Sequence, residues 1–125
     1  MLANLPIAPV LRAADVERAK RFYTQTLGLP LMMDMGEVFT VGAGNGTMLA
    51  VYRRDGSEAP LNTVAGWQTD DVRAVARDLK ARGVTPERYE LPGVTYDDLG
   101  VATMGDSTML WFTDSEGNIL QVVQM

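Results

Sequence analysis

The side chains that could perform chemistry in this chain are few. The sequence contains no histidine and no cysteine, which excludes thiol nucleophiles, zinc–thiolate sites and histidine acid–base catalysis. No closely spaced glutamate pair or Ser-His arrangement is present, so Asp34 and Glu37 are the only evident candidates for a carboxylate base. Arg12 could hold a carboxylate or phosphate group through two parallel hydrogen bonds. The residue types therefore favour binding over catalysis.

The elements that must position these residues follow a pattern that occurs twice. Asp15-Val16 opens a helical stretch that closes at Leu27-Gly28-Leu29, and Asp71-Val72 opens a second that closes at Arg82-Gly83-Val84. Asp15 suits the N-cap of the first helix and either Asp70 or Asp71 suits that of the second, and in each copy the glycine suits the C-terminal end. The repeat predicts two modules that form half-shells around one shared cavity.

Apolar runs divided by turn residues predict the strands of both modules. They are residues 5–11, 29–35, 38–41 and 47–53, then 62–69, 85–90, 101–104, 108–113 and 119–124. We therefore expect an α+β fold of two tandem βαβββ modules, about 1–54 and about 62–125, in a single domain of residues 1–125. Segment 54–61 is the expected linker, and the loop 91–100 is long enough to cover a site.

Alternation along the strands assigns faces. Because every second side chain of a strand points the same way, Ala8, Val10 and Arg12 share one face of the first strand. Met48, Ala50 and Tyr52 likewise share one face of the fourth strand, and Arg12 and Tyr52 are the first candidates for the cavity side. The same rule groups Val64, Gly66 and Gln68. If a helix covers one side of each half-sheet, the opposite sides line the cavity.

The chain resembles the glyoxalase, bleomycin-resistance and extradiol-dioxygenase superfamily, also called the vicinal oxygen chelate fold. The resemblance rests on Asp15-Val16-Glu17-Arg18-Ala19-Lys20-Arg21-Phe22-Tyr23 followed by Leu27-Gly28-Leu29, on Asp70-Asp71-Val72, and on Asp114-Ser115-Glu116-Gly117-Asn118-Ile119-Leu120-Gln121. It covers essentially the whole chain. In this family the open sheet edges usually close against a second chain, so the resemblance implies a two-fold homodimer.

Enzymes of this family usually hold one divalent metal on residues of the first, fourth, fifth and last strands. The corresponding positions are Ala8, Ala50, Val64 and Gln121. Three of these residues have no ligand atom, and one neutral amide is a weak ligand for a divalent ion. We therefore expect no metal and no other cofactor, and we do not expect glyoxalase I or extradiol dioxygenase activity.

An apolar floor with a few polar groups is typical of a small-molecule pocket. The predicted ligand-binding residues are Arg12, Met48, Tyr52, Gln68, Trp111 and Gln121, with Phe39 and Tyr96 at the rim. Aromatic faces among them could stack on a planar or cationic ligand. Trp67 is expected behind the sheet, in the core beside the second helix.

Each candidate also has a purely structural interpretation. Arg12 could pair with Asp15 or Glu37, and Gln121 could bond to Gln68. Trp111 and the eight methionines could belong to the core. The segment 42–46 lacks the Lys-Ser/Thr ending and the following helix of a phosphate-binding loop, so it is predicted as a turn.

Composition restricts the partners. The formal net charge is −5, and the 11 Lys and Arg residues are scattered, which argues against nucleic acid. No basic leader and no run of about 18 apolar residues is present. We therefore expect no membrane partner. The absence of cysteine favours a cytoplasmic protein, and the acidic surface suits a cationic ligand.

Three functions remain open from the sequence. The predicted one is a metal-independent protein that binds and sequesters a small drug-like or cationic metabolite. The second is a metal-independent lyase, isomerase or epimerase with a carboxylate base. The third is a non-catalytic structural or regulatory subunit whose cavity is filled by its own side chains.

Overall fold

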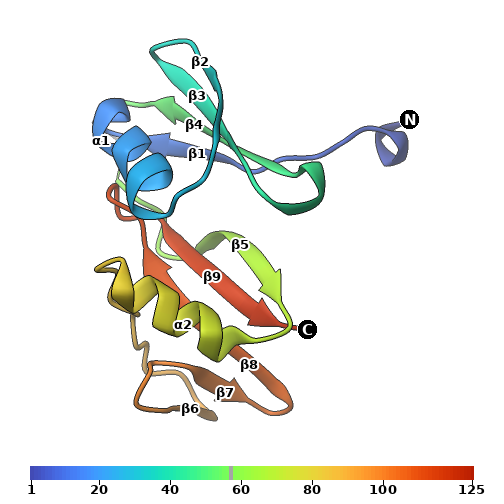
Figure 1. Ribbon diagram of the computed structural model, residues 1–125, viewed down its shortest axis with the longest axis vertical. Helices are drawn as coiled ribbons and strands as arrows, with labels where there is room; N and C mark the ends of the chain where they lie inside the picture. Colours follow the sequence, from blue (N-terminus) through green and yellow to red (C-terminus); the bar gives the residue numbers. More distant parts are fainter. Residues whose placement is uncertain (57) are drawn as a thin grey trace. The chain divides into compact units, whose positions relative to one another are not determined.

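The computed structural model describes residues 1–56 and 58–125, and these form two compact units, Met1–Glu58 and Ala59–Met125 (Figure 1). Each unit combines a helix with one sheet, which confirms the predicted α+β fold of two modules. The boundary between the units falls within the predicted linker 54–61, of which Ser57 lies outside the described residues.

Unit 1 contains a four-stranded sheet in the order β1-β4-β3-β2. Its strands are β1 (Val10–Ala13), β2 (Leu31–Asp34), β3 (Val38–Gly42) and β4 (Met48–Arg53). Strand β1 runs parallel to β4, and the other neighbours are antiparallel. The helical segments are α1 (Val16–Arg21), a π-helical turn η2 (Phe22–Thr26), and two short 3₁₀ turns, η1 (Leu2–Asn4) and η3 (Gly44–Gly46).

The helix of unit 1 has the predicted caps. Asp15 accepts a hydrogen bond from the backbone N–H of Arg18 at 3.0 Å, and Gly28 adopts a φ of +76° after the last turn. The second half of the predicted helix is a π-helical turn, which is wider than an α-helix, because the N–H of Leu27 donates to the carbonyl of Phe22, five residues back. Tyr23, within this wide turn, is fully buried.

The first strand begins five residues later than predicted. Proline has no N–H to donate to a sheet, and Pro6 and Pro9 both precede β1. The carbonyl of Pro9 still accepts a hydrogen bond from the N–H of Ala50 at 3.0 Å. Ala8, the expected first-strand ligand position, therefore lies outside the strand and is exposed.

Unit 2 contains a five-stranded sheet in the order β5-β9-β8-β7-β6. Its strands are β5 (Thr63–Thr69), β6 (Val94–Tyr96), β7 (Ala102–Met104), β8 (Ser107–Thr113) and β9 (Ile119–Gln124). Helix α2 (Val72–Ala81) packs on β8 and β9 (Figure 1). Strand β5 runs parallel to β9, and the other neighbours are antiparallel.

Two side chains, Asp71 and Gln124, accept hydrogen bonds from the backbone at the start of α2. Asp71 accepts from the N–H of Ala74 at 3.1 Å, as predicted for an N-cap. The side-chain carbonyl of Gln124, at the end of β9, accepts from the N–H of Val72 at 3.0 Å. The helix start is therefore bound to the sheet through side-chain hydrogen bonds as well as through its buried face, which comprises Val72, Ala76 and Leu79.

The segment between α2 and β7 differs from the prediction. Residues 85–90 do not form a strand, and only Glu87 makes a bridge, through its N–H to the carbonyl of Trp111 at 2.7 Å. A strand forms instead at Val94–Tyr96, inside the predicted loop 91–100. Asp97 makes this possible because its Oδ1 accepts from the N–H groups of Leu99 and Val101, both at 2.9 Å, and so closes a turn between β6 and β7.

The turn between β8 and β9 is where the sequence predicts it. Oδ1 of Asp114 accepts from the N–H groups of Glu116 at 2.8 Å and Asn118 at 2.9 Å, and its Oδ2 accepts from the side-chain amide of Asn118 at 2.8 Å. Asp114 and Asn118 are both buried. One carboxylate thus satisfies three donors that would otherwise be costly to bury.

In the described part of the chain, no helix has the length and apolar content that crossing a bilayer requires.

Candidate functional site

The sheet of unit 1 has one face packed with its helix and one face without it. The packed face is buried almost completely, and its residues include Leu11, Phe39, Val41, Leu49 and Val51. Phe39 is fully buried there, with its ring centroid 6.4 Å from that of Tyr23. The predicted place of Phe39 at a cavity rim is therefore wrong, because the pairing of Phe39 with Val51 turns it toward the helix.

The opposite face of unit 1 carries the other predicted residues of this module. Arg12 is the register partner of Tyr52, and Val10 is the partner of Ala50, so these side chains form neighbouring rows on one face. Arg12 and Tyr52 are half-buried, and Val10 is 62% exposed.

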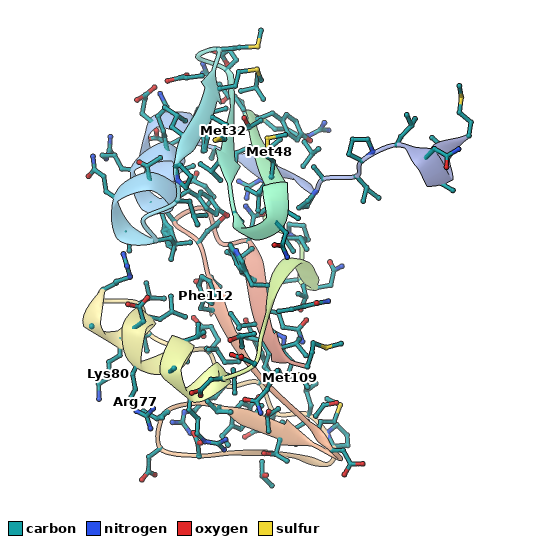
Figure 2. The ribbon with its side chains drawn as sticks, turned by 45° about the vertical axis from the view of Figure 1, so that its right-hand side comes forward. Met32, Met48, Arg77, Lys80, Met109 and Phe112 are labelled. Atoms are coloured by element: carbon teal, nitrogen blue, oxygen red, sulfur yellow. The ribbon has the colours of Figure 1, made fainter. Side chains whose placement is uncertain are left out.

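Methionines extend this face toward its edge. Met48 pairs with Gly42, and a side chain at Gly42 would lie 3.2 Å from Met32, so Met32 lies over the glycine beside Met48 (Figure 2). Met32, Met33 and Met48 are between 43% and 59% exposed. We refer to Val10, Met32, Met33 and Met48 as the methionine face. Such flexible apolar side chains adapt readily to a ligand or partner.

In unit 2 the helix-free face carries the remaining predicted residues. Gly66, Gln121 and Trp111 form one row across β5, β9 and β8. The neighbouring row runs through Gln68, Val123, Met109, Ala102 and Tyr96. Gln68 and Gln121 thus share a face, as alternation predicts, and the sheet also brings Trp111 and Tyr96, a residue of the predicted loop, to that face.

Trp111 is buried on this face by its own module. It is 6% exposed and forms a cluster with Met109 and Ala102, and the ring of Tyr89 meets it edge-on at 5.8 Å. Trp67 lies on the opposite face, half-buried and stacked on Phe112 at 6.0 Å. The core interpretation of Trp111 is therefore supported, and Trp67 is more exposed than predicted.

The amide of Gln121 has a partner that the sequence did not predict. Its Nε2 donates to the thioether sulfur of Met109 at 3.3 Å. Among residues 1–56 and 58–125, no hydrogen bond joins Gln121 to Gln68, and no group donates to Oε1 of Gln121. The carbonyl oxygen of this amide therefore remains available to a ligand with a hydrogen-bond donor.

These two faces belong to a fold that is widespread among known proteins. The family model of the Glyoxalase/Bleomycin resistance protein/Dioxygenase superfamily matches residues 7–122. The chain belongs to this superfamily.

Solved structures of the superfamily share the fold at low sequence identity. The chain is 19% identical to a bleomycin resistance determinant encoded on the transposon Tn5, with a TM-score of 0.69 over 97% of this chain and 98% of that one. It is 19% identical to a lactoylglutathione lyase from Agrobacterium tumefaciens, with a TM-score of 0.67 over 97% and 93%. A glyoxalase/bleomycin resistance protein from Streptomyces sp. CB03234 is 26% identical, with a TM-score of 0.60 over 95% and 100%. The sequence has no match among curated proteins.

The residues at the superfamily's metal positions do not fit a metal ion. Ala8, Ala50 and Val64 have no donor atom in their side chains, and Gln121 offers only a neutral amide. In the described part of the chain, no three His, Cys, Asp or Glu side chains form a group that could hold a metal ion. We therefore derive no chemistry through a metal.

The two candidate carboxylate bases are both held in ion pairs. Asp34 lies 2.7 Å from Lys20 of α1 and accepts the N–H of Gly36 at 3.0 Å, and these two hydrogen bonds lower the pKa of its carboxyl group. Glu37 lies 3.4 Å from Arg53 at an exposed position. A general base works best with a pKa raised toward neutrality, so the environment of Asp34 opposes that role.

Unit 2 also has a pocket that the sequence analysis did not predict. It has a volume of about 600 Å³ and is lined by Arg88, Tyr89, Glu90, Leu91, Pro92, Val94 and Tyr96. Only Tyr96 was among the predicted site residues. The mixture of tyrosine, charged and proline residues over 86–96 is the one signal in the sequence that marks this segment. We refer to this hollow as the Arg88 pocket.

Proposed function

We propose that this chain is a metal-independent small-molecule-binding protein of the superfamily, which sequesters a drug-like molecule or a cationic metabolite. The observation that carries the proposal is that Ala8, Ala50 and Val64, at positions where the resemblance implies metal ligands, have no donor atom in their side chains. The similarity to a bleomycin resistance determinant supports a binding role. We further propose a cytoplasmic homodimer that does not bind nucleic acid or membranes.

The proposed ligand-binding residues come from the two helix-free faces. Unit 1 contributes Arg12, Met48 and Tyr52, and unit 2 contributes Gln68, Tyr96 and Gln121, with Trp111 in the core beneath this face. They combine apolar and aromatic surface with a guanidinium and two amides, which is the usual composition of a small-molecule site. The shared cavity stays a prediction.

A thermal-shift screen with drug-like and cationic compounds tests this function. At least one class of compound should raise the melting temperature, because a ligand that binds only the folded state stabilises it. Tyr52→Ala and Gln121→Ala should each reduce that shift, whereas Asp98→Asn, at an exposed loop position, should leave it unchanged. A broad screen without any shift would refute the proposed function.

The alternative enzymatic function has less support. A metal-independent lyase, isomerase or epimerase needs a base, and both candidates are ion-paired. A structural or regulatory subunit has one observation in its favour, the burial of Trp111 by Tyr89 and its neighbours. Ligand screening distinguishes this role from small-molecule binding.

A further inference from the structure

The Arg88 pocket has a wall that the protein holds in place. The hydroxyl of Tyr96 donates to the carbonyl of Tyr89 at 2.6 Å and accepts from the N–H of the same residue at 2.8 Å. The phenol therefore fastens the segment before β6 to the strand itself. The hydroxyl is bonded to the backbone of Tyr89, and Tyr96 is among the residues that line the pocket. Because this wall is already fixed, it does not have to be ordered when a ligand binds, and the entropic cost of binding is smaller.

Arg88 is the unpaired cation of this pocket. Its guanidinium lies 5.8 Å from the ring centroid of Tyr96, near the outer limit for a cation–π contact. Arg53 and Arg73, by contrast, pair with Asp55 at 3.0 Å and Asp97 at 3.1 Å. Within residues 1–56 and 58–125, no carboxylate pairs with Arg88. Its planar set of N–H donors is therefore available to an anion from outside the chain.

The remaining lining sets the shape and charge of the ligand. Leu91, Pro92 and Val94 supply apolar surface beside the Tyr96 ring. Glu90 contributes a negative charge to the same lining, so a ligand with one negative charge is better tolerated than a dianion such as phosphate. An apolar wall, an aromatic ring and one unpaired guanidinium together match a flat apolar body with a single carboxylate.

We propose that the Arg88 pocket binds a planar aromatic monocarboxylate, with the carboxylate on the Arg88 guanidinium and the ring against Tyr96, Leu91 and Val94. This inference rests on the proposed small-molecule-binding function. At this pocket it replaces the cationic ligand expected from the net charge by an anionic one, because local donors outweigh a distant surface charge that salt screens.

Calorimetric titration with three probes of one ring system tests the proposal. 2-Naphthoate should bind, whereas 2-naphthylmethanol and 2-naphthylmethylamine, which lack the carboxylate, should bind at least about tenfold more weakly. Arg88→Gln should weaken 2-naphthoate binding by at least about tenfold and leave the melting temperature unchanged, because Arg88 is exposed and makes no ion pair.

Arg77→Gln is the matched control. Arg77 is exposed on α2, has no ion pair in the described part of the chain, and lies outside the pocket lining (Figure 2). Its loss changes the net charge by the same amount, so 2-naphthoate should bind this variant as it binds the parent chain. Equal binding to Arg88→Gln and Arg77→Gln, equal binding of the amine and the carboxylate, or no binding of 2-naphthoate would each overturn the assignment. If other compounds still bind through Tyr52 or Gln121, the proposed function survives that result.

Discussion

At the scale of single residues, two polar side chains, Asp114 and Gln121, have different roles. The Asp114 carboxylate accepts three hydrogen bonds within its own turn. The amide of Gln121, at a position where the resemblance implies a metal ligand, donates to the sulfur of Met109. The first arrangement stabilises the fold, and the second leaves one carbonyl oxygen for a ligand.

Asp114→Ala should lower the free energy of unfolding by about 2–4 kcal/mol, because it leaves buried N–H donors of Glu116 and Asn118 without an acceptor. Urea unfolding followed by circular dichroism measures the change. Asp98→Ala, in an exposed loop position, should change stability by less than about 0.5 kcal/mol. Similar losses in both variants would contradict the role assigned to the turn.

The two tryptophans should differ in the direction opposite to the one expected from sequence. Trp111 is 6% exposed, whereas Trp67 is half-buried, so Trp111→Ala should cost at least as much stability as Trp67→Ala, about 3–5 kcal/mol. Thermal and urea unfolding of both variants provide the comparison. A clearly larger loss for Trp67→Ala would show that Trp111 is not a core residue of unit 2.

At the scale of elements, short-range side-chain contacts decide where helices and turns begin. Asp15 and Asp71 cap the two helices. Asp97 closes the turn between β6 and β7 and also pairs with Arg73 of α2 at 3.1 Å, so one carboxylate joins the hairpin to the helix. The Arg88 pocket is held by the same hairpin, since Tyr96 belongs to β6.

Asp97 should make stability depend on pH below about 4. Burial opposes ionisation, but hydrogen bonds from Val101 and Leu99 and the pair with Arg73 outweigh it and lower the pKa of this carboxyl group. A carboxyl group with a lowered pKa stabilises the fold above its unfolded-state pKa, and that contribution disappears as the pH falls through the folded-state value.

Asp97→Asn should therefore reduce the loss of unfolding free energy between pH 5 and about pH 2. Urea unfolding at several pH values measures this slope. Part of the slope should remain in this variant, because the pKa of Asp34 is also lowered. Asp98→Asn removes an equal charge from the neighbouring exposed position and should leave the slope as it is. An identical acid limb for Asp97→Asn and the parent chain would refute the linkage.

At the scale of the whole molecule, the chain belongs to the superfamily, and we propose that it does so without a metal ion. The family model spans residues 7–122, but three of the four positions at which the resemblance implies metal ligands have no donor atom in their side chains. We expect purified protein to hold no stoichiometric divalent ion, and zinc, nickel or manganese should not change its melting temperature. Elemental analysis that finds about one tightly bound ion per chain would contradict this expectation.

The methionine face bears on assembly. Exposed apolar surface of this kind is typical of a protein interface or a ligand surface. We expect a homodimer in solution, measured by light scattering as twice the chain mass. If the methionine face forms the interface, Met48→Glu should shift the protein toward monomer, while Met125→Glu, at another exposed methionine, should not. A monomeric parent protein at working concentrations would exclude the dimer.

The sequence alone was sufficient for several features that depend on neighbours along the chain, although the turn closed by Asp97 and the π-helical turn at 22–26 were not among them. The caps at Asp15 and Asp71, the turn at 114–118, the two-module fold and the absence of metal-binding side chains can all be predicted from residue types and spacing. These features depend on hydrogen bonds that span two to four residues, or on atoms that a side chain does or does not have.

The tertiary structure decided which face each strand turns toward its helix and which residues cover one another. The pairing of Phe39 with Val51 buries Phe39. The ring of Tyr89, from another segment, packs against Trp111, and the hydroxyl of Tyr96 fastens the wall of the Arg88 pocket to β6. Strand alternation allows either of two faces, and a shift of one residue exchanges them. Only contacts between residues far apart in sequence select one arrangement, and no local pattern encodes them.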